Sequence, residues 1–132
     1  MDRVRDAMVS EPRALPGTAS AREAGELLTR PEVRAVFVVD CERLTGVVTR
    51  KTLVSRVVAE GRDPGSTLLS EIGEEPYYTI GPDVGLEDAF RFLEEHDAER
   101  IPVVEEGRLI GVLSRSVLQR RLAEDEEPPE QE

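Results

Sequence analysis

Residues 101–118 read IPVVEEGRLIGVLSRSVL, and residues 36–53 read VFVVDCERLTGVVTRKTL. The two stretches align without a gap, so that each position of the earlier stretch recurs 65 residues later. Each contains two runs rich in β-branched residues separated by a short polar segment, which is the pattern of a β-hairpin. Repetition at a fixed offset indicates internal duplication. We therefore expect two copies of one structural unit.

The same offset extends upstream of both hairpins into a helical pattern. In the second copy, apolar residues recur at i, i+3, i+4 and i+7, as expected for one buried face of a helix; they are Leu86, Ala89, Phe90 and Leu93. Asp83 lies just before this run and is placed to cap the helix. Ala24 and Leu28 occupy the matching positions of the first copy, so a helix is expected there too.

Both copies therefore predict the element order β-α-β-β-α. The expected elements of the first copy are a strand at 14–15, a helix over 20–29, strands over 35–39 and 44–49, and a helix over 51–59. Those of the second copy begin with an extended run over 77–80 and the helix from 86. Strands over 101–104 and 108–113 follow, joined by a turn at 105–107. A last helix opens at Ser114, with Val117, Leu118 and Leu122 available for burial.

These elements divide the chain into three segments. We expect the first repeat with its lead-in over 1–62 and the second repeat over 63–122. Residues 123–132, AEDEEPPEQE, form an acidic tail that cannot bury enough apolar surface to fold.

Charge and composition exclude several classes of function. Among 132 residues, 17 are basic and 28 acidic, for a net charge of −11. A general affinity for nucleic acid or anionic membranes needs a basic face, so neither partner is expected. No stretch approaches the ~20 consecutive apolar residues of a membrane span, and we expect a cytoplasmic protein.

Catalytic and metal-binding motifs are absent from the sequence. Cys41 is the only cysteine, which excludes an internal disulfide and a cysteine-based zinc cluster. His96 is the only histidine and stands among acidic residues, without a second ligand motif. The chain contains no P-loop, nucleophile elbow or H-E-x-x-H sequence. We therefore expect neither an enzyme nor a bound metal.

The hairpin stretches resemble the signature half of the CBS domain, named for cystathionine beta-synthase. Residues 4–8 resemble the lead-in of that family, residues 70–72 hold the equivalent place in the second copy, and the resemblance spans about 3–122. It implies an α/β fold of the α+β type, a tandem CBS pair or Bateman module whose repeats pack with pseudo-two-fold symmetry. It also implies clefts between the repeats that bind adenine nucleotides or related adenosyl ligands, and association into a homodimer.

The resemblance also assigns site residues, and here the sequence departs from the family. The family pattern G-h-h-[S/T]-x-x-D places its hydroxyl at Thr49 and Ser114 and its ribose-binding Asp at Thr52 and Val117. Both acids are therefore missing. A hydrogen bond to a charged group contributes about 1.5–3 kcal/mol, so this loss weakens ribose binding by roughly ten- to a hundredfold.

Other residues are candidates for compensating contacts. Arg50 and Arg115 follow the hydroxyl residues directly, where a basic side chain at a helix start suits phosphate. The resemblance implies base contacts through the main chain near Leu15 and Ile80, and Pro102 completes the candidate set. Structural roles explain the same residues: Thr49 and Ser114 as helix caps, the arginines as solvated charges, Pro102 as a strand end and Val117 as a core residue.

Two functions from different classes follow from these observations. The first is a non-catalytic regulatory module that senses a small molecule, with AMP, ADP, ATP or S-adenosylmethionine as candidate ligands. The second is a degenerate CBS pair that serves as a ligand-free dimerisation or docking scaffold. Both include a protein partner whose identity the sequence does not give.

Overall fold

The computed structural model describes residues 2–10 and 12–125, which form two compact units. The first-repeat unit comprises residues 12–77 and 107–109, and the second-repeat unit comprises residues 2–10, 78–106 and 110–125. In both units, the lead-in of one copy packs with the repeat of the other copy. The lead-in helix α1 (Val4–Ala7) belongs to the second-repeat unit, and α4 (Leu69–Ile72) belongs to the first.

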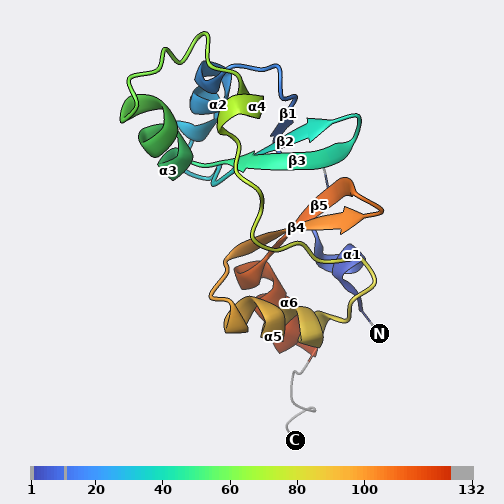
Figure 1. The fold of residues 1–132 in the computed structure, drawn as a ribbon. Helices are drawn as coiled ribbons and strands as arrows, with labels where there is room; N and C mark the ends of the chain where they lie inside the picture. Colours follow the sequence, from blue (N-terminus) through green and yellow to red (C-terminus); the bar gives the residue numbers. More distant parts are fainter. Residues whose placement is uncertain (1, 11, 126–132) are drawn as a thin grey trace, which may run out of the picture. The chain divides into compact units, whose positions relative to one another are not determined.

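The first-repeat unit combines three strands with short helices (Figure 1). Its other elements are β1 (Ala14–Leu15), α2 (Ala21–Leu28), β2 (Val36–Asp40), β3 (Arg43–Val48), α3 (Arg50–Leu53) and the π-helix η1 (Val54–Val58). Strand β1 pairs parallel with β2, and β2 pairs antiparallel with β3. The helix expected over 51–59 begins as predicted but widens at Val54, where Ala59 N–H donates to the Val54 carbonyl at 2.8 Å.

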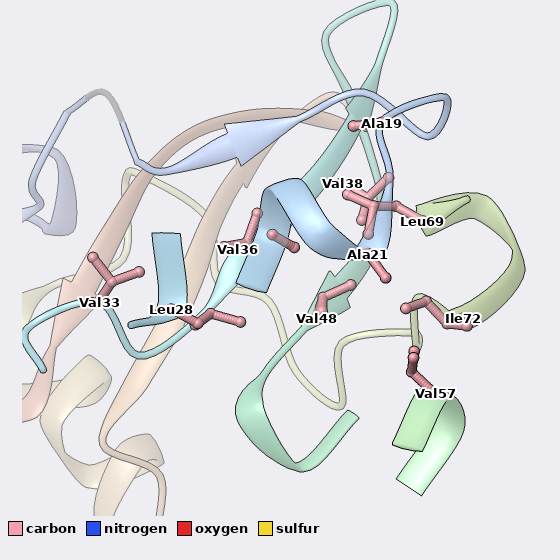
Figure 2. Close-up of a cluster of buried hydrophobic side chains, with 11 residues drawn as sticks. Ala19, Ala21, Leu28, Val33, Val36, Val38, Val48, Val57, Leu69 and Ile72 are labelled. Carbon is pink, nitrogen blue, oxygen red and sulfur yellow. The ribbon is translucent and has the colours of Figure 1, made fainter. Parts of the chain in front are cut away.

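The core of this unit lies between α2, the strands and α4 (Figure 2). Val36, Val48, Leu69 and Ile72 are each 0% exposed. Fully burying one such side chain stabilises the fold by about 1.5–3 kcal/mol. The lead-in helix α4 therefore contributes directly to the core of the first-repeat unit.

Helix α2 begins with a reciprocal cap. The Ser20 hydroxyl accepts from Glu23 N–H at 3.2 Å, and Ser20 N–H donates to the Glu23 carboxylate at 2.9 Å. This capping box satisfies two backbone N–H groups that a helix start leaves without a partner.

The second-repeat unit contains two hydrogen-bonded strands and two longer helices (Figure 1). Besides α1, its elements are α5 (Leu86–Glu95), β4 (Arg100–Glu105), β5 (Arg108–Ser114) from residue 110 onward, and α6 (Arg115–Asp125). Leu86, Ala89 and Leu93 are buried as predicted, and Phe90 packs against the same core. The β4–β5 turn has positive φ at Glu106 (54°) and Gly107 (84°), which suits the right-handed twist of a tight hairpin.

Four expectations about this unit differ from the structure. Asp83 does not cap α5, whose N-cap is Gly85, because its carboxylate pairs with Arg5 at 3.1 Å. This hydrogen bond raises the pKa of the Arg5 guanidinium. The extended run over 77–80 forms no strand, and only Ile80 makes a bridge, to Val103. Val117 is half-buried and lies outside the core cluster.

The fourth difference concerns the acidic segment. Helix α6 continues to Asp125, so the tail expected from residue 123 begins inside a helix, and residues 126–132 lie outside the described residues. Within the described ranges, no helix is long and apolar enough to cross a membrane.

Candidate functional site

Backbone pairing with β3 places Glu74 in the first-repeat unit. Gly46 of β3 and Gly73, which follows α4, lie next to each other, since a Cβ atom on Gly46 would be in ordinary van der Waals contact with the Gly73 Cα at 3.5 Å. The segment after α4 runs along β3, where Val47 N–H donates to the Glu74 carbonyl at 2.7 Å. Glu74 N–H donates back to the Val47 carbonyl at 3.0 Å. These two bonds fix the backbone from which the Glu74 side chain extends.

Thr49 and Thr52 form a reciprocal cap at the start of α3. The Thr49 hydroxyl accepts from Thr52 N–H at 3.3 Å, and Thr49 N–H donates to Thr52 Oγ1 at 3.0 Å. Thr52 is 0% exposed, whereas Thr49 is half-buried. The structural role expected for Thr49 is thus confirmed, and Thr52 shares it.

A carboxylate from the lead-in completes this array. The Thr52 hydroxyl donates to Glu74 Oε1 at 3.1 Å, since an ionised carboxylate can only accept. The Thr49 and Thr52 hydroxyl oxygens are 3.1 Å apart, and Thr49 must be the donor because the single Thr52 proton already faces Glu74. We name these three residues the threonine–glutamate array: Thr49, Thr52 and Glu74.

The matching place in the second-repeat unit is much less polar. Ser114 is buried, and its hydroxyl lies 3.5 Å from Val117 N–H and 3.1 Å from the Ser116 hydroxyl. Ser114 thus opens α6 as expected, with a long capping bond. Val9 bridges Val112 in this unit as Glu74 bridges Val47 in the other. Val117 and Val9 therefore stand where the first-repeat unit has Thr52 and Glu74.

The two candidate arginines both contact polar groups of their own unit. Arg50 Nη2 donates to the Arg30 carbonyl at 2.8 Å. Arg115 Nη1 lies 3.6 Å from the Asp97 carboxylate, and Arg115 N–H donates to the Glu99 carbonyl at 2.8 Å. Each guanidinium has five N–H donors and makes one of these side-chain contacts, so donors remain for an anion.

The remaining candidates take part in strand pairing. Leu15 is half-buried and pairs with Val38. Ile80 N–H donates to the Pro102 carbonyl at 3.1 Å, while Val104 N–H donates to the Ile80 carbonyl at 2.9 Å. Pro102 is buried inside β4, so the expectation that it marks a strand end is wrong.

The structure thus brings Thr49 and Thr52 together and adds Glu74, which the sequence analysis missed. The available signal was its position: Glu74 lies two residues after the lead-in residues 70–72, and 65 residues after Val9. Among the described residues, no cluster of three or more His, Cys, Asp or Glu side chains could hold a metal ion, and Cys41 is exposed and free.

A separate open groove lies between α5 and α6 of the second-repeat unit. None of the predicted site residues contributes to it. Its lining residues are Glu87, Phe90, Arg91, Glu94, Gln119, Leu122 and Ala123.

Comparison with known proteins places these features in a family. The CBS domain profile matches residues 4–59 and 69–124, one match for each repeat. The CBS domain-containing protein YhcV of Bacillus subtilis is 30% identical over 114 residues, which are 86% of this chain and 81% of that protein.

Solved structures share the same fold. The crystal structure of CBSX2 in complex with AMP has 25% sequence identity and a TM-score of 0.78, and it covers 95% of this chain and 98% of that chain. Hypoxic Response Protein I, crystallised with two coordinated zinc ions, gives a TM-score of 0.77 over 92% of this chain and 99% of that chain, with 24% identity. The profile match to both repeats and the likeness to YhcV lead to one conclusion: this chain belongs to the CBS domain family as a tandem CBS pair.

Proposed function

We propose that the chain is a non-catalytic regulatory module that binds an adenosine-containing nucleotide at the first-repeat unit. The observation that carries this proposal is the threonine–glutamate array, which stands where the family pattern puts a hydroxyl and a ribose-binding acid. The AMP complex of CBSX2, a structure similar over 95% of this chain, supports AMP as the first ligand to test.

The difference between the two units supports a single nucleotide for each chain. Ribose and phosphate bind through hydrogen bonds, and a site with Val9 and Val117 in place of Glu74 and Thr52 offers fewer acceptors and donors. The second-repeat unit would leave polar groups of the ligand without partners, which costs binding free energy.

Thermal unfolding with added nucleotide tests the proposal. A ligand that binds only the folded state stabilises it by RT ln(1 + [L]/Kd), or about 2.7 kcal/mol at a hundredfold excess over Kd. We expect a concentration-dependent rise in Tm with AMP, ADP, ATP or S-adenosylmethionine at millimolar concentration. No rise with any of these ligands or with NAD, for a protein that is folded, would contradict the proposal.

The second proposal is a ligand-free scaffold that dimerises or docks another protein. It is favoured by two exposed apolar side chains one turn apart on η1, Val54 at 60% and Val58 at 72% exposure. Exposed apolar surface of this kind marks interaction sites when it is contiguous. Sedimentation of the wild-type chain and a Val58→Ser variant tests this: the scaffold proposal expects a dimer that the substitution weakens, and a monomeric wild type would contradict it.

A further inference from the structure

The two copies carry different residues at two structurally equivalent positions. The bridge between Val47 and Glu74 corresponds to the bridge between Val112 and Val9, since Val47 and Val112 are related by the repeat offset of 65 residues. At the third residue after the capping hydroxyl, Thr52 corresponds to Val117. Both positions are polar in the first-repeat unit and both are valine in the second. The first copy thus has both the Glu74 carboxylate and its partner, the Thr52 hydroxyl, and the second copy has neither group.

The hydrogen bonds of Thr52 leave it no capacity for a ligand. A hydroxyl has one proton to donate and two lone pairs to accept with. The proton of Thr52 faces Glu74, and its lone pairs accept from Thr49 N–H at 3.0 Å and from the Thr49 hydroxyl at 3.1 Å. With an exposed fraction of 0%, the side chain also offers no surface for contact. Thr52 therefore does not replace the missing acid by binding ribose itself.

Glu74 does have spare capacity. Its Oε1 accepts one hydrogen bond, and no described residue bonds to Oε2. A carboxylate has about four lone-pair sites, so most of its accepting capacity remains available to a ligand. The residue is exposed, while its bond to the buried Thr52 restricts its rotamers and lowers the entropy cost of binding.

We propose that Glu74 accepts hydrogen bonds from the vicinal ribose hydroxyls of the bound nucleotide, with Thr52 as the residue that positions it. This inference rests on the proposed function, because it names the group that selects the sugar at the same site. The Glu74 carboxylate comes from the segment that follows α4. The family carries its acid at a different place, the α3 position that Thr52 occupies in this chain. Its consequence is specificity for ribonucleotides over 2′-deoxyribonucleotides.

Titration calorimetry with AMP and 2′-deoxy-AMP tests this assignment on three proteins: the wild-type chain, Glu74→Gln and Glu75→Gln. Glu75 is an exposed neighbour, so its variant makes the same change in net charge without altering the array. We expect the wild type and Glu75→Gln to bind AMP about tenfold or more tightly than 2′-deoxy-AMP. Glu74→Gln should lose about ten- to a hundredfold in affinity for AMP and bind both nucleotides alike.

The outcomes separate the two proposals. Equal affinity for AMP in the wild type and Glu74→Gln, with the preference for ribose unchanged, would overturn the role of Glu74 and leave the nucleotide site standing. No AMP binding by the folded wild type would overturn the proposed function and, with it, the role of Glu74. Unfolding curves of each variant check the fold, which Glu74→Gln should keep because the backbone bonds to Val47 do not involve its side chain.

Discussion

Replacing Thr52 with valine puts a methyl group in the place of one buried hydroxyl and keeps the branched shape of the side chain. Three interactions disappear: acceptance from Thr49 N–H at 3.0 Å, the contact with the Thr49 hydroxyl at 3.1 Å and donation to Glu74 at 3.1 Å. Thr52 is 0% exposed, so water cannot replace its hydroxyl, and the new methyl group fills the same space. Loss of hydrogen bonds is therefore the main change that the substitution makes.

The size of the loss in stability depends on the groups that lose their hydrogen bond to Thr52. A hydrogen bond to a charged group contributes about 1.5–3 kcal/mol, and a buried donor left without a partner costs about 1–3 kcal/mol. Glu74 is exposed and Thr49 only half-buried, so water partly compensates both and the low end of each range applies. We expect Thr52→Val to lower the free energy of unfolding by about 2 kcal/mol, or a Tm lower by about 6–10 °C for a chain of this size.

Urea denaturation followed by circular dichroism measures this change, with Val117→Thr as the matched control. Val117 holds the equivalent position in the second copy but is half-buried and has no carboxylate beside it, so its variant should change stability by less than about 0.5 kcal/mol. A Thr52→Val variant as stable as the wild type would refute the hydrogen-bonded array. A double-mutant cycle that combines Thr52→Val with Glu74→Gln measures the interaction free energy between the two side chains. We expect this interaction free energy to exceed about 0.5 kcal/mol.

Three further substitutions test the packing of the units by chemical denaturation. Ser20→Ala removes the cap of α2 and should cost about 1 kcal/mol, and a cost near zero would show that the Glu23 bonds do not hold in solution. Gly111→Ala places a Cβ 2.9 Å from the Val9 carbonyl oxygen and should cost about 1–3 kcal/mol; an unchanged midpoint would argue against this close approach. Leu93→Ala empties a site that is 0% exposed and should cost about 2–5 kcal/mol, whereas a cost below 1 kcal/mol would contradict its place in the core.

The repeats and most of their elements could be predicted because they rest on local patterns. The alternation of β-branched residues predicted both hairpins, and the helical spacing of Leu86, Ala89 and Leu93 predicted a buried face that the structure confirms. The same reasoning does not distinguish an α-helix from a π-helix, because the residues of η1 suit either. The widening at Val54 was therefore not foreseen.

The errors arose where a distant residue competes with a local preference. Asp83 has the side chain of a good N-cap, but Arg5, far away in the sequence, pairs with its carboxylate. Glu74 was missed for a similar reason, because its hydrogen bond to Thr52 spans 22 residues and depends on how the lead-in packs. Such contacts come from the folded backbone, and no spacing rule in a single sequence encodes them.

The most direct test of the account is the amide spectrum of the isotopically labelled chain during a titration with AMP. We predict that the signals of Thr49, Thr52 and Glu74 shift together and saturate at one nucleotide per chain. The amide signals of Val9 and Val117 should shift no more on addition of AMP than those of surface residues unrelated to the site. Shifts centred on Val9 and Val117 with Glu74 unmoved would contradict the placement of the nucleotide at the first-repeat unit.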